Sequence, residues 1–91
     1  MQALPDHVVH YKSTPEFTET SVPAALLKHH NTAEGVWGRI TILEGTLTYQ
    51  IIEPAAETVL LTPEHPGIVE PRMLHHVEVT GPVRFRVDFH R

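Results

Sequence analysis

Hydrophobic and polar residues alternate with a period of two along most of this chain of 91 residues. The alternating runs are rich in Val, Ile, Thr, Tyr and Phe, which is typical of β-strands. Eight prolines are spread along the sequence, so no helical period can extend far. The pattern predicts an all-β fold whose expected strands are Val8–Lys12, Ala24–His29, Val36–Leu43, Thr46–Ile52, Thr58–Leu61, Gly67–Val69, Leu74–Thr80 and Val83–Phe89.

Turn residues separate the expected strands. Glu44-Gly45 predicts a tight hairpin, and Thr80-Gly81-Pro82 predicts an antiparallel connection between the last two strands. The stretch Ser13–Val22 has no period, so we expect it to lie over the sheet as an arm or to exchange with a partner in a dimer. The length predicts a single domain over 1–91, with an N-terminal strand and arm over 1–23 and a barrel or jelly roll over 24–91.

Composition narrows the functional classes. The net charge of −4 and the scattered Lys and Arg residues provide no basic stripe, which argues against nucleic acid as a partner. No apolar run is long enough to span a bilayer, and the first ten residues lack a signal-peptide pattern, so we expect a cytoplasmic protein without a membrane partner. Without cysteine, a metal site would use His, Asp and Glu. No phosphate-binding loop or nucleophile elbow is present.

Eight histidines are the most unusual feature of the composition, and four of them form the pairs His29-His30 and His75-His76. Strand alternation places His75 on the apolar face with Val77, and His76 on the polar face. A buried imidazole needs a hydrogen bond, a ligand or a metal, so His75 is either a satisfied core residue or part of a site. Spacing alone does not choose between His29 and His30, because the preceding Ala-Ala-Leu-Leu is apolar on both faces.

A third candidate ligand lies close to His30 in the sequence. The turn from His30 to Gly35 is placed to bring Glu34 back beside His30, although a solvated loop carboxylate is the alternative. Two imidazoles and one carboxylate suit Fe(II), Mn, Ni or Zn, so the candidate metal site combines His75, one member of the His29-His30 pair, and Glu34. Trp37 and Arg39 are candidate residues of a ligand pocket, Arg39 for an anionic ligand. Their alternatives are a packed indole and a surface residue paired with Glu.

Several stretches resemble a known family. Ile40–Tyr49, with its turn at Glu44-Gly45, resembles the end of the first cupin motif, and Pro66–Pro71 followed by His75–Glu78 resembles the second. Almost the whole chain is similar to the small cupin-like domain of the tellurite-resistance-related family, which also precedes a methyltransferase domain in some proteins. Further matching stretches are Val9 to Pro15 with Phe17, Val22–Ala24, His30–Thr32, Gly35–Gly38 and Phe85–Phe89.

The resemblance implies a cupin-like double-stranded β-helix and selects His30 and His75 from the two pairs. The spacing from Pro71 instead favours His76, as in a standard second motif. The first motif departs from the cupin pattern, because Gly35–Arg39 supplies no His-x-His and Glu. A complete four-ligand site is therefore not expected. A role in stress, towards tellurite or other oxyanions, is implied by the family alone.

Three functional hypotheses follow. The first is a cupin that binds a divalent metal (Zn, Fe, Mn or Ni) with open positions for a small molecule or oxyanion, as a binding protein or an enzyme. The second is a metal-free homodimeric binding or interaction module whose histidines are structural. The third is a structural homodimer without a ligand. Exposed strand edges and a small core favour a homodimer in each case.

Overall fold

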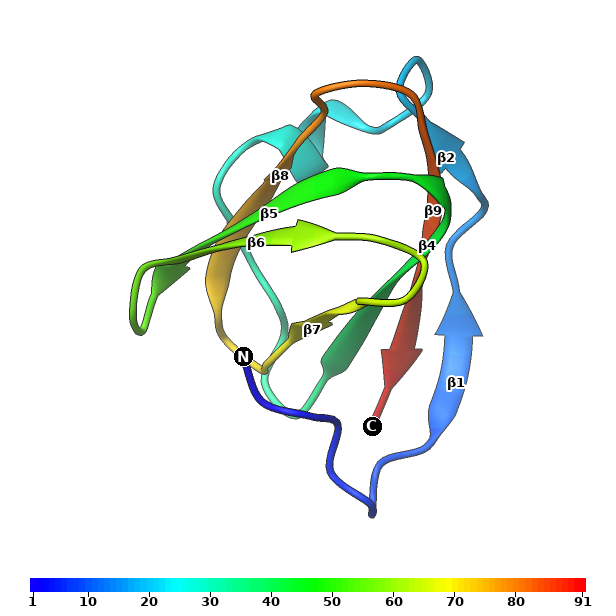
Figure 1. Cartoon of the computed structure of the whole chain (residues 1–91). Helices are drawn as coiled ribbons and strands as arrows, with labels where there is room; N and C mark the ends of the chain where they lie inside the picture. The colour runs from blue at the N-terminus through cyan, green and yellow to red at the C-terminus, as the bar shows by residue number, and fades with distance from the viewer.

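The computed structural model describes all 91 residues as two antiparallel sheets that pack face to face (Figure 1). The first sheet has the order β1 (His10–Ser13), β9 (Val83–His90), β4 (Trp37–Gly45) and β7 (Gly67–Val69), with β2 (Phe17–Thr18) also paired to β9. The second sheet has the order β3 (His30–Asn31), β8 (Leu74–Glu78), β5 (Leu47–Glu53) and β6 (Glu57–Leu61). The predicted all-β class is confirmed.

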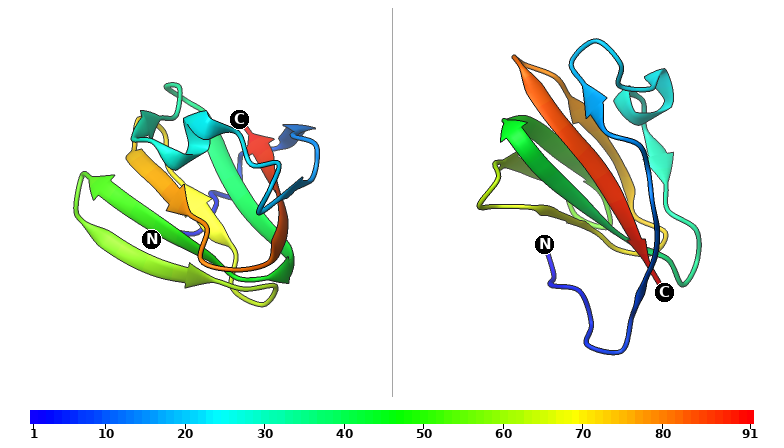
Figure 2. Two further views of the ribbon diagram at one scale, coloured as in Figure 1. Left: turned by 90° about the horizontal axis from the view of Figure 1, so that it is seen from above. Right: turned by 90° about the vertical axis from the view of Figure 1, so that its right-hand side faces the viewer.

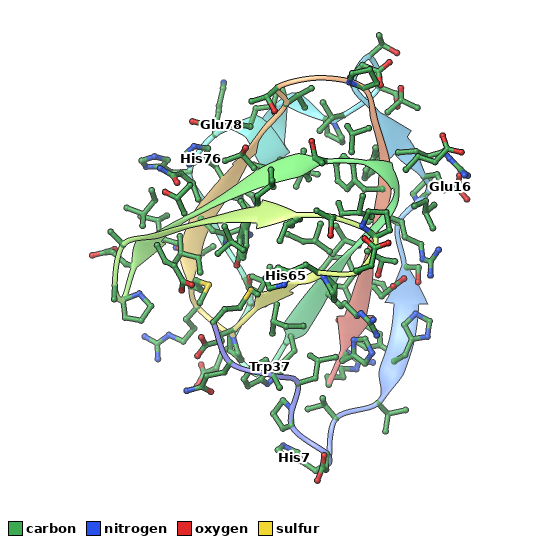
Figure 3. All side chains as sticks on the ribbon, in the orientation of Figure 1. His7, Glu16, Trp37, His65, His76 and Glu78 are labelled. Carbon is green, nitrogen blue, oxygen red and sulfur yellow. The ribbon has the colours of Figure 1, made fainter.

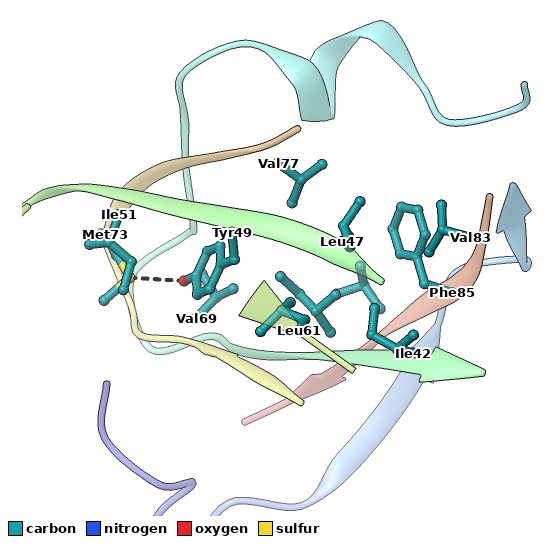
Figure 4. Packing of buried hydrophobic residues seen from close by; sticks show 12 residues of the cluster. Ile42, Leu47, Tyr49, Ile51, Leu61, Val69, Met73, Val77, Val83 and Phe85 are labelled. Atoms are coloured by element: carbon teal, nitrogen blue, oxygen red, sulfur yellow. Dashed lines mark hydrogen bonds between the residues drawn. The ribbon is translucent and has the colours of Figure 1, made fainter. Parts of the chain in front are cut away.

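The core lies between the sheets and is built from alternate residues of each long strand (Figure 4). Leu47, Tyr49 and Ile51 are buried on β5, as are Val83 and Phe85 on β9. Burying each such side chain contributes roughly 1.5–3 kcal/mol. The hydroxyl of Tyr49 donates to the Ile68 carbonyl at 3.0 Å, and burial raises the pKa of this phenol above its usual range. The strand alternation thus fixes which residues face the other sheet.

The hairpin predicted at Glu44-Gly45 and the antiparallel connection predicted at Thr80-Gly81-Pro82 are both wrong. β4 and β5, on either side of Glu44-Gly45, belong to different sheets, and so do β8 and β9 on either side of Thr80-Gly81-Pro82. Gly45 has a φ of +78°, and a Cβ there would lie 2.1 Å from the Pro82 carbonyl oxygen. The two segments are therefore sheet-crossing corners that pack against each other. A period of two shows which face of a strand is buried but not which sheet the strand joins.

The segment before β3 also differs from the expected strand. Ala24–Leu27 forms a 3-10 helix, η1, directly after Pro23. This segment is apolar on both faces, a pattern that does not distinguish a strand from a short helix. The expected arm, in turn, contains β2, where Phe17 packs edge-on against Phe85 with ring centroids 5.6 Å apart.

The residues before β1 form a loop at one end of the molecule, with a turn at Asp6-His7 (Figure 2). The Met1 ammonium group lies 3.1 Å from Glu57 on β6, and the backbone of Val9 pairs with Arg91 at the end of the chain. The N-terminal arm therefore contacts both sheets. None of the helical structure is long and apolar enough to cross a membrane.

Candidate functional site

A cavity of about 390 Å³ lies between the two sheets. Its lining is mostly hydrophobic and includes Ile40, Val77 and Phe85 from the strands. The remaining wall comes from three segments: the arm around β1 and β2, the helix η1, and the residues that follow β3. The cavity is of the size and character of small-molecule pockets in proteins.

Two neighbouring histidines, His30 and His75, line this cavity. His30 on β3 is the direct cross-strand neighbour of His75 on β8, and their ring centroids are 4.0 Å apart. Both side chains line the cavity, and His75 is only 5% exposed. Strand alternation correctly predicted that His75 points inward, and the pairing register brings His30 to it from 45 residues away in the sequence.

Each of these rings is anchored by its backbone. Nδ1 of His30 lies 2.9 Å from the Lys28 carbonyl oxygen, and Nδ1 of His75 lies 2.9 Å from the Met73 carbonyl oxygen. A carbonyl oxygen accepts only, so both Nδ1 atoms must carry hydrogen and donate. In the neutral ring, Nε2 is then left as a lone-pair acceptor. The two backbone contacts therefore select the same tautomer for both histidines.

The charge of His75 is also set by its surroundings. Burial lowers the pKa of His75 to about 4, and the neighbouring His30 and His76 act in the same direction. The hydrogen bond to Met73 opposes this shift without cancelling it. At neutral pH, His75 is consequently an uncharged acceptor.

The other members of the two sequence pairs lie outside the cavity. His29 and His76 stack with ring centroids 5.0 Å apart, and His76 Nε2 lies 3.3 Å from the exposed carboxylate of Glu78 (Figure 3). The buried Nδ1 of His76 has no hydrogen-bond partner. Each sequence pair thus splits between the inner and the outer side of the second sheet.

The structure does not bring every predicted site residue to this cavity. Glu34 is exposed in a turn, does not line the cavity, and no group of three or more His, Asp or Glu residues is arranged to hold a metal. Trp37 and Arg39 do not line it either, because Gly38 and Ile40 take the inward positions of β4. Arg39 instead lines a second cleft on the outer face of the first sheet.

Sequence reasoning missed the residues that share this second cleft with Arg39. His10, Ser13 and Asp88 come from opposite ends of the chain and meet only because β1 pairs with β9. The sequence holds one signal for this cleft: polar residues alternate along the last strand from Arg84 to His90, which predicts that Asp88 and His90 share one face.

Comparison with known proteins assigns the chain to a family. The TehB-like domain family matches residues 12–87. The chain belongs to this tellurite-resistance-related family. It is 32% identical over 79 residues to the probable S-adenosyl-L-methionine-dependent methyltransferase TehB of Haemophilus influenzae, covering 82% of this chain and 28% of that protein. It is also 26% identical to the protein YeaR of Escherichia coli K12, covering 98% of this chain and 82% of YeaR.

Solved structures show the same architecture. A crystal structure of an Escherichia coli K12 protein matches with a TM-score of 0.87 at 23% identity, over 100% of this chain and 97% of that one. The crystal structure of Haemophilus influenzae TehB matches with a TM-score of 0.83 at 29% identity, over 93% of this chain and 32% of TehB. The TehB-like domain therefore spans less than a third of the TehB relatives that it matches.

Proposed function

We propose that this TehB-like domain is a binding module that takes a small, mostly apolar molecule into the cavity between its sheets. In this proposal His30 and His75 hold the polar end of the ligand, either directly or through a divalent metal ion. The observation that carries it is the backbone anchoring of both rings at 2.9 Å, which leaves two Nε2 acceptors in one apolar cavity.

The chemistry of the pair favours certain ligands. With Nδ1 engaged, the Nε2 lone pair of a neutral ring attracts a hydrogen-bond donor, such as a hydroxyl or an amine, or a metal cation. A bare oxyanion would meet two lone pairs here, so an oxyanion in this cavity would need a metal or a protonated imidazole between it and the rings.

A metal would find two protein ligands here. An Nδ1–H bond to a backbone carbonyl is the usual support of a metal-binding histidine, so His30 and His75 fit the role. Glu34 does not reach the cavity, which leaves the other coordination positions to solvent or to the bound molecule. Of the metals expected from the sequence, Zn and Ni suit imidazole better than Mn, which prefers oxygen ligands.

Metal binding can be tested with the metals alone. Isothermal titration of untagged protein with Zn(II), Ni(II), Fe(II) and Mn(II) should show the tightest binding for Zn(II) or Ni(II), weakened at least about tenfold in His30→Ala. His30 is half-buried, so this variant should fold, which circular dichroism checks. His65→Ala removes an exposed histidine and should bind as the wild type does. Equal binding by all three proteins would exclude the His30–His75 pair as the metal site.

Direct ligand binding needs a separate probe. Benzyl alcohol and toluene differ by one hydroxyl, so NMR titration compares a donor with its apolar counterpart in the same cavity. We expect cavity residues to shift with both probes and benzyl alcohol to bind more tightly, with the difference lost in His30→Ala. Absence of cavity shifts with either probe, together with no metal binding, would contradict the proposal.

The fold supports the proposal at the level of architecture. The strand orders β1-β9-β4-β7 and β3-β8-β5-β6 support a double Greek-key jelly roll, which is the arrangement of cupins. We therefore include the cupin-like double-stranded β-helix in the proposal. The proposal also includes a cytoplasmic location and a role in resistance to tellurite. It rests there on the family alone, whose relative TehB is a probable S-adenosyl-L-methionine-dependent methyltransferase.

A metal-free homodimer is the second candidate, and one strand favours it. β6 is an edge strand paired only with β5, and its Leu60 is 57% exposed. Unprotected edges with exposed hydrophobic residues pair readily with a second copy. Light scattering after gel filtration should show a dimer that Leu60→Lys converts to a monomer. A monomeric wild-type protein would exclude this candidate.

A further inference from the structure

A second cleft, of about 430 Å³, lies on the outer face of the first sheet. Its lining contains no hydrophobic residue and consists of His10, Ser13, Arg39, Arg86, Asp88 and His90. These residues come from three neighbouring strands, β1, β9 and β4, and none of them lines the cavity between the sheets. The cleft is therefore a separate candidate site.

The strand register places the residues of the cleft in rows of cross-strand neighbours. His10 lies opposite His90, with ring centroids 5.5 Å apart. In the next row Asp88 lies between Ser13 on β1 and Arg39 on β4. Arg86 follows two residues before Asp88 on the same face of β9. The two guanidinium groups are thus carried by adjacent strands on one side of the sheet.

Asp88 is the fixed centre of this arrangement. Its Oδ1 accepts from the Ser13 hydroxyl at 2.6 Å and from Arg86 Nε at 2.9 Å, and its Oδ2 accepts from the Thr41 hydroxyl at 2.8 Å. Burial opposes ionisation, but these three donors outweigh it and lower the pKa of the carboxyl group. Asp88 is therefore a charged, fully engaged acceptor that orients its neighbours.

The remaining donors point to the chemistry of a ligand. The Arg86 contact uses Nε and leaves the terminal guanidinium nitrogens, while Arg39 is exposed and takes part in none of the ion pairs. Two arginines against one aspartate give the cleft a local charge of +1, whereas the chain as a whole carries −4. By contrast, Arg84 on the same strand is already bound by Glu16 and Glu44.

The geometry points to an oxyanion-binding site in this cleft, in which Arg39 and Arg86 hold a phosphate or carboxylate group of a small molecule. Guanidinium groups present a planar fork of donors that matches such groups. The Ser13 hydroxyl proton goes to Asp88, so His10 Nε2 donates to Ser13 Oγ at 2.7 Å and is not free to hold an anion. The arginines therefore provide the main contacts with the anion.

Inorganic phosphate and acetate are the probes for this site. In an NMR titration at constant ionic strength, phosphate, acetate or both should shift the amides of residues 39 and 88. Arg39→Gln should weaken that binding about tenfold, which is the loss expected for a charge-assisted hydrogen bond. Arg39 is exposed, so the variant should fold normally. Arg84→Gln removes a charge from the same face and should leave the affinity unchanged.

The two probes also separate two sources of the anion. Binding of phosphate alone supports a phosphate-type ligand, and binding of acetate supports a carboxylate. The proposal is overturned if neither probe gives a saturable shift at roughly 20 mM, where a site with a Kd of about 1 mM is nearly filled. It is also overturned if Arg84→Gln weakens binding as much as Arg39→Gln, since that would show a nonspecific response to surface charge. His30→Ala should have no effect here, so this test is independent of the interior cavity.

Discussion

Two pairs of histidines in this domain share a geometry but differ in chemistry. His30 and His75 face each other across β3 and β8, and His10 and His90 face each other across β1 and β9. The first pair is tied to backbone carbonyls inside an apolar cavity, whereas the second belongs to a polar cleft with two arginines and an aspartate. The comparison shows that the neighbours of an imidazole, rather than its cross-strand placement, decide what it can bind.

The difference has a physical origin in burial. Inside the sandwich, no charge compensates a protonated ring, so the interior pair offers acceptors to donors or cations. On the outer face, arginines are accessible and their charge is only half neutralised by Asp88. We therefore propose two sites of opposite preference, one in the interior of the domain and one on the outer face of its first sheet.

The largest predicted difference between the pairs is in pH dependence. The pKa of His75 is about 4 in the folded metal-free protein and about 6.5 when unfolded, so the unfolded state binds more protons below pH 6.5. Its contribution to stability is complete above pH 6.5 and is lost as the pH falls towards 4. Urea unfolding should show a loss of about 2–3 kcal/mol between pH 7 and pH 4.5, reduced in His75→Gln.

His90→Gln is the control for that experiment. Its side chain lies in the polar outer cleft, so the variant should keep the pH dependence of the wild type. If His75→Gln and His90→Gln reduced the pH dependence of the free energy of unfolding equally, the predicted distinction between the two histidine pairs would be wrong.

A smaller loss is expected from the outer network. Asp88→Asn removes the charge on which the donors of Ser13, Thr41 and Arg86 converge, and should lower the free energy of unfolding at pH 7 by about 1–3 kcal/mol. Thermal and urea unfolding measure this loss, and metal titration of the interior pair should remain unchanged. An altered metal affinity would show that the two sites are coupled.

The smallest effect is expected for the third pair, His29 and His76. The contact between His76 Nε2 and the exposed carboxylate of Glu78 is solvent-screened, so Glu78→Gln should change the free energy of unfolding by less than about 0.5 kcal/mol. Urea unfolding at pH 6 and pH 8 provides the measurement. A change as large as that of Asp88→Asn would mean that the His76–Glu78 contact stabilises the protein as strongly as the hydrogen bonds of Asp88.

Local periodicity predicted much of the fold and one half of the interior pair. Alternation on β8 predicted the burial of His75, and alternation on β9 predicted its inner face. It did not predict that Gly45 lies in a corner between sheets, because face and sheet membership are independent properties. His30 came from the family resemblance, and its meeting with His75 depends on a register that no local pattern encodes.

The outer cleft could not be predicted from local sequence patterns either, because it also depends on pairing between distant strands. Ser13 and Asp88 are 75 residues apart and become neighbours only through the pairing of the two ends of the chain. Arg39 was predicted to bind an anion from the chemistry of its side chain, but its face was assigned to the wrong pocket. The buried positions of Gly38 and Ile40 determine that face.

Long-range proton–nitrogen NMR of the histidine rings at pH 7.5 tests the central claim most directly, because it reports which ring nitrogen carries the proton. The account predicts that His30 and His75 are both protonated at Nδ1 only, and that His10 carries its proton at Nε2, where it donates to Ser13. A proton at Nε2 of His30 or His75 would turn the interior site from an acceptor into a donor and would contradict the account.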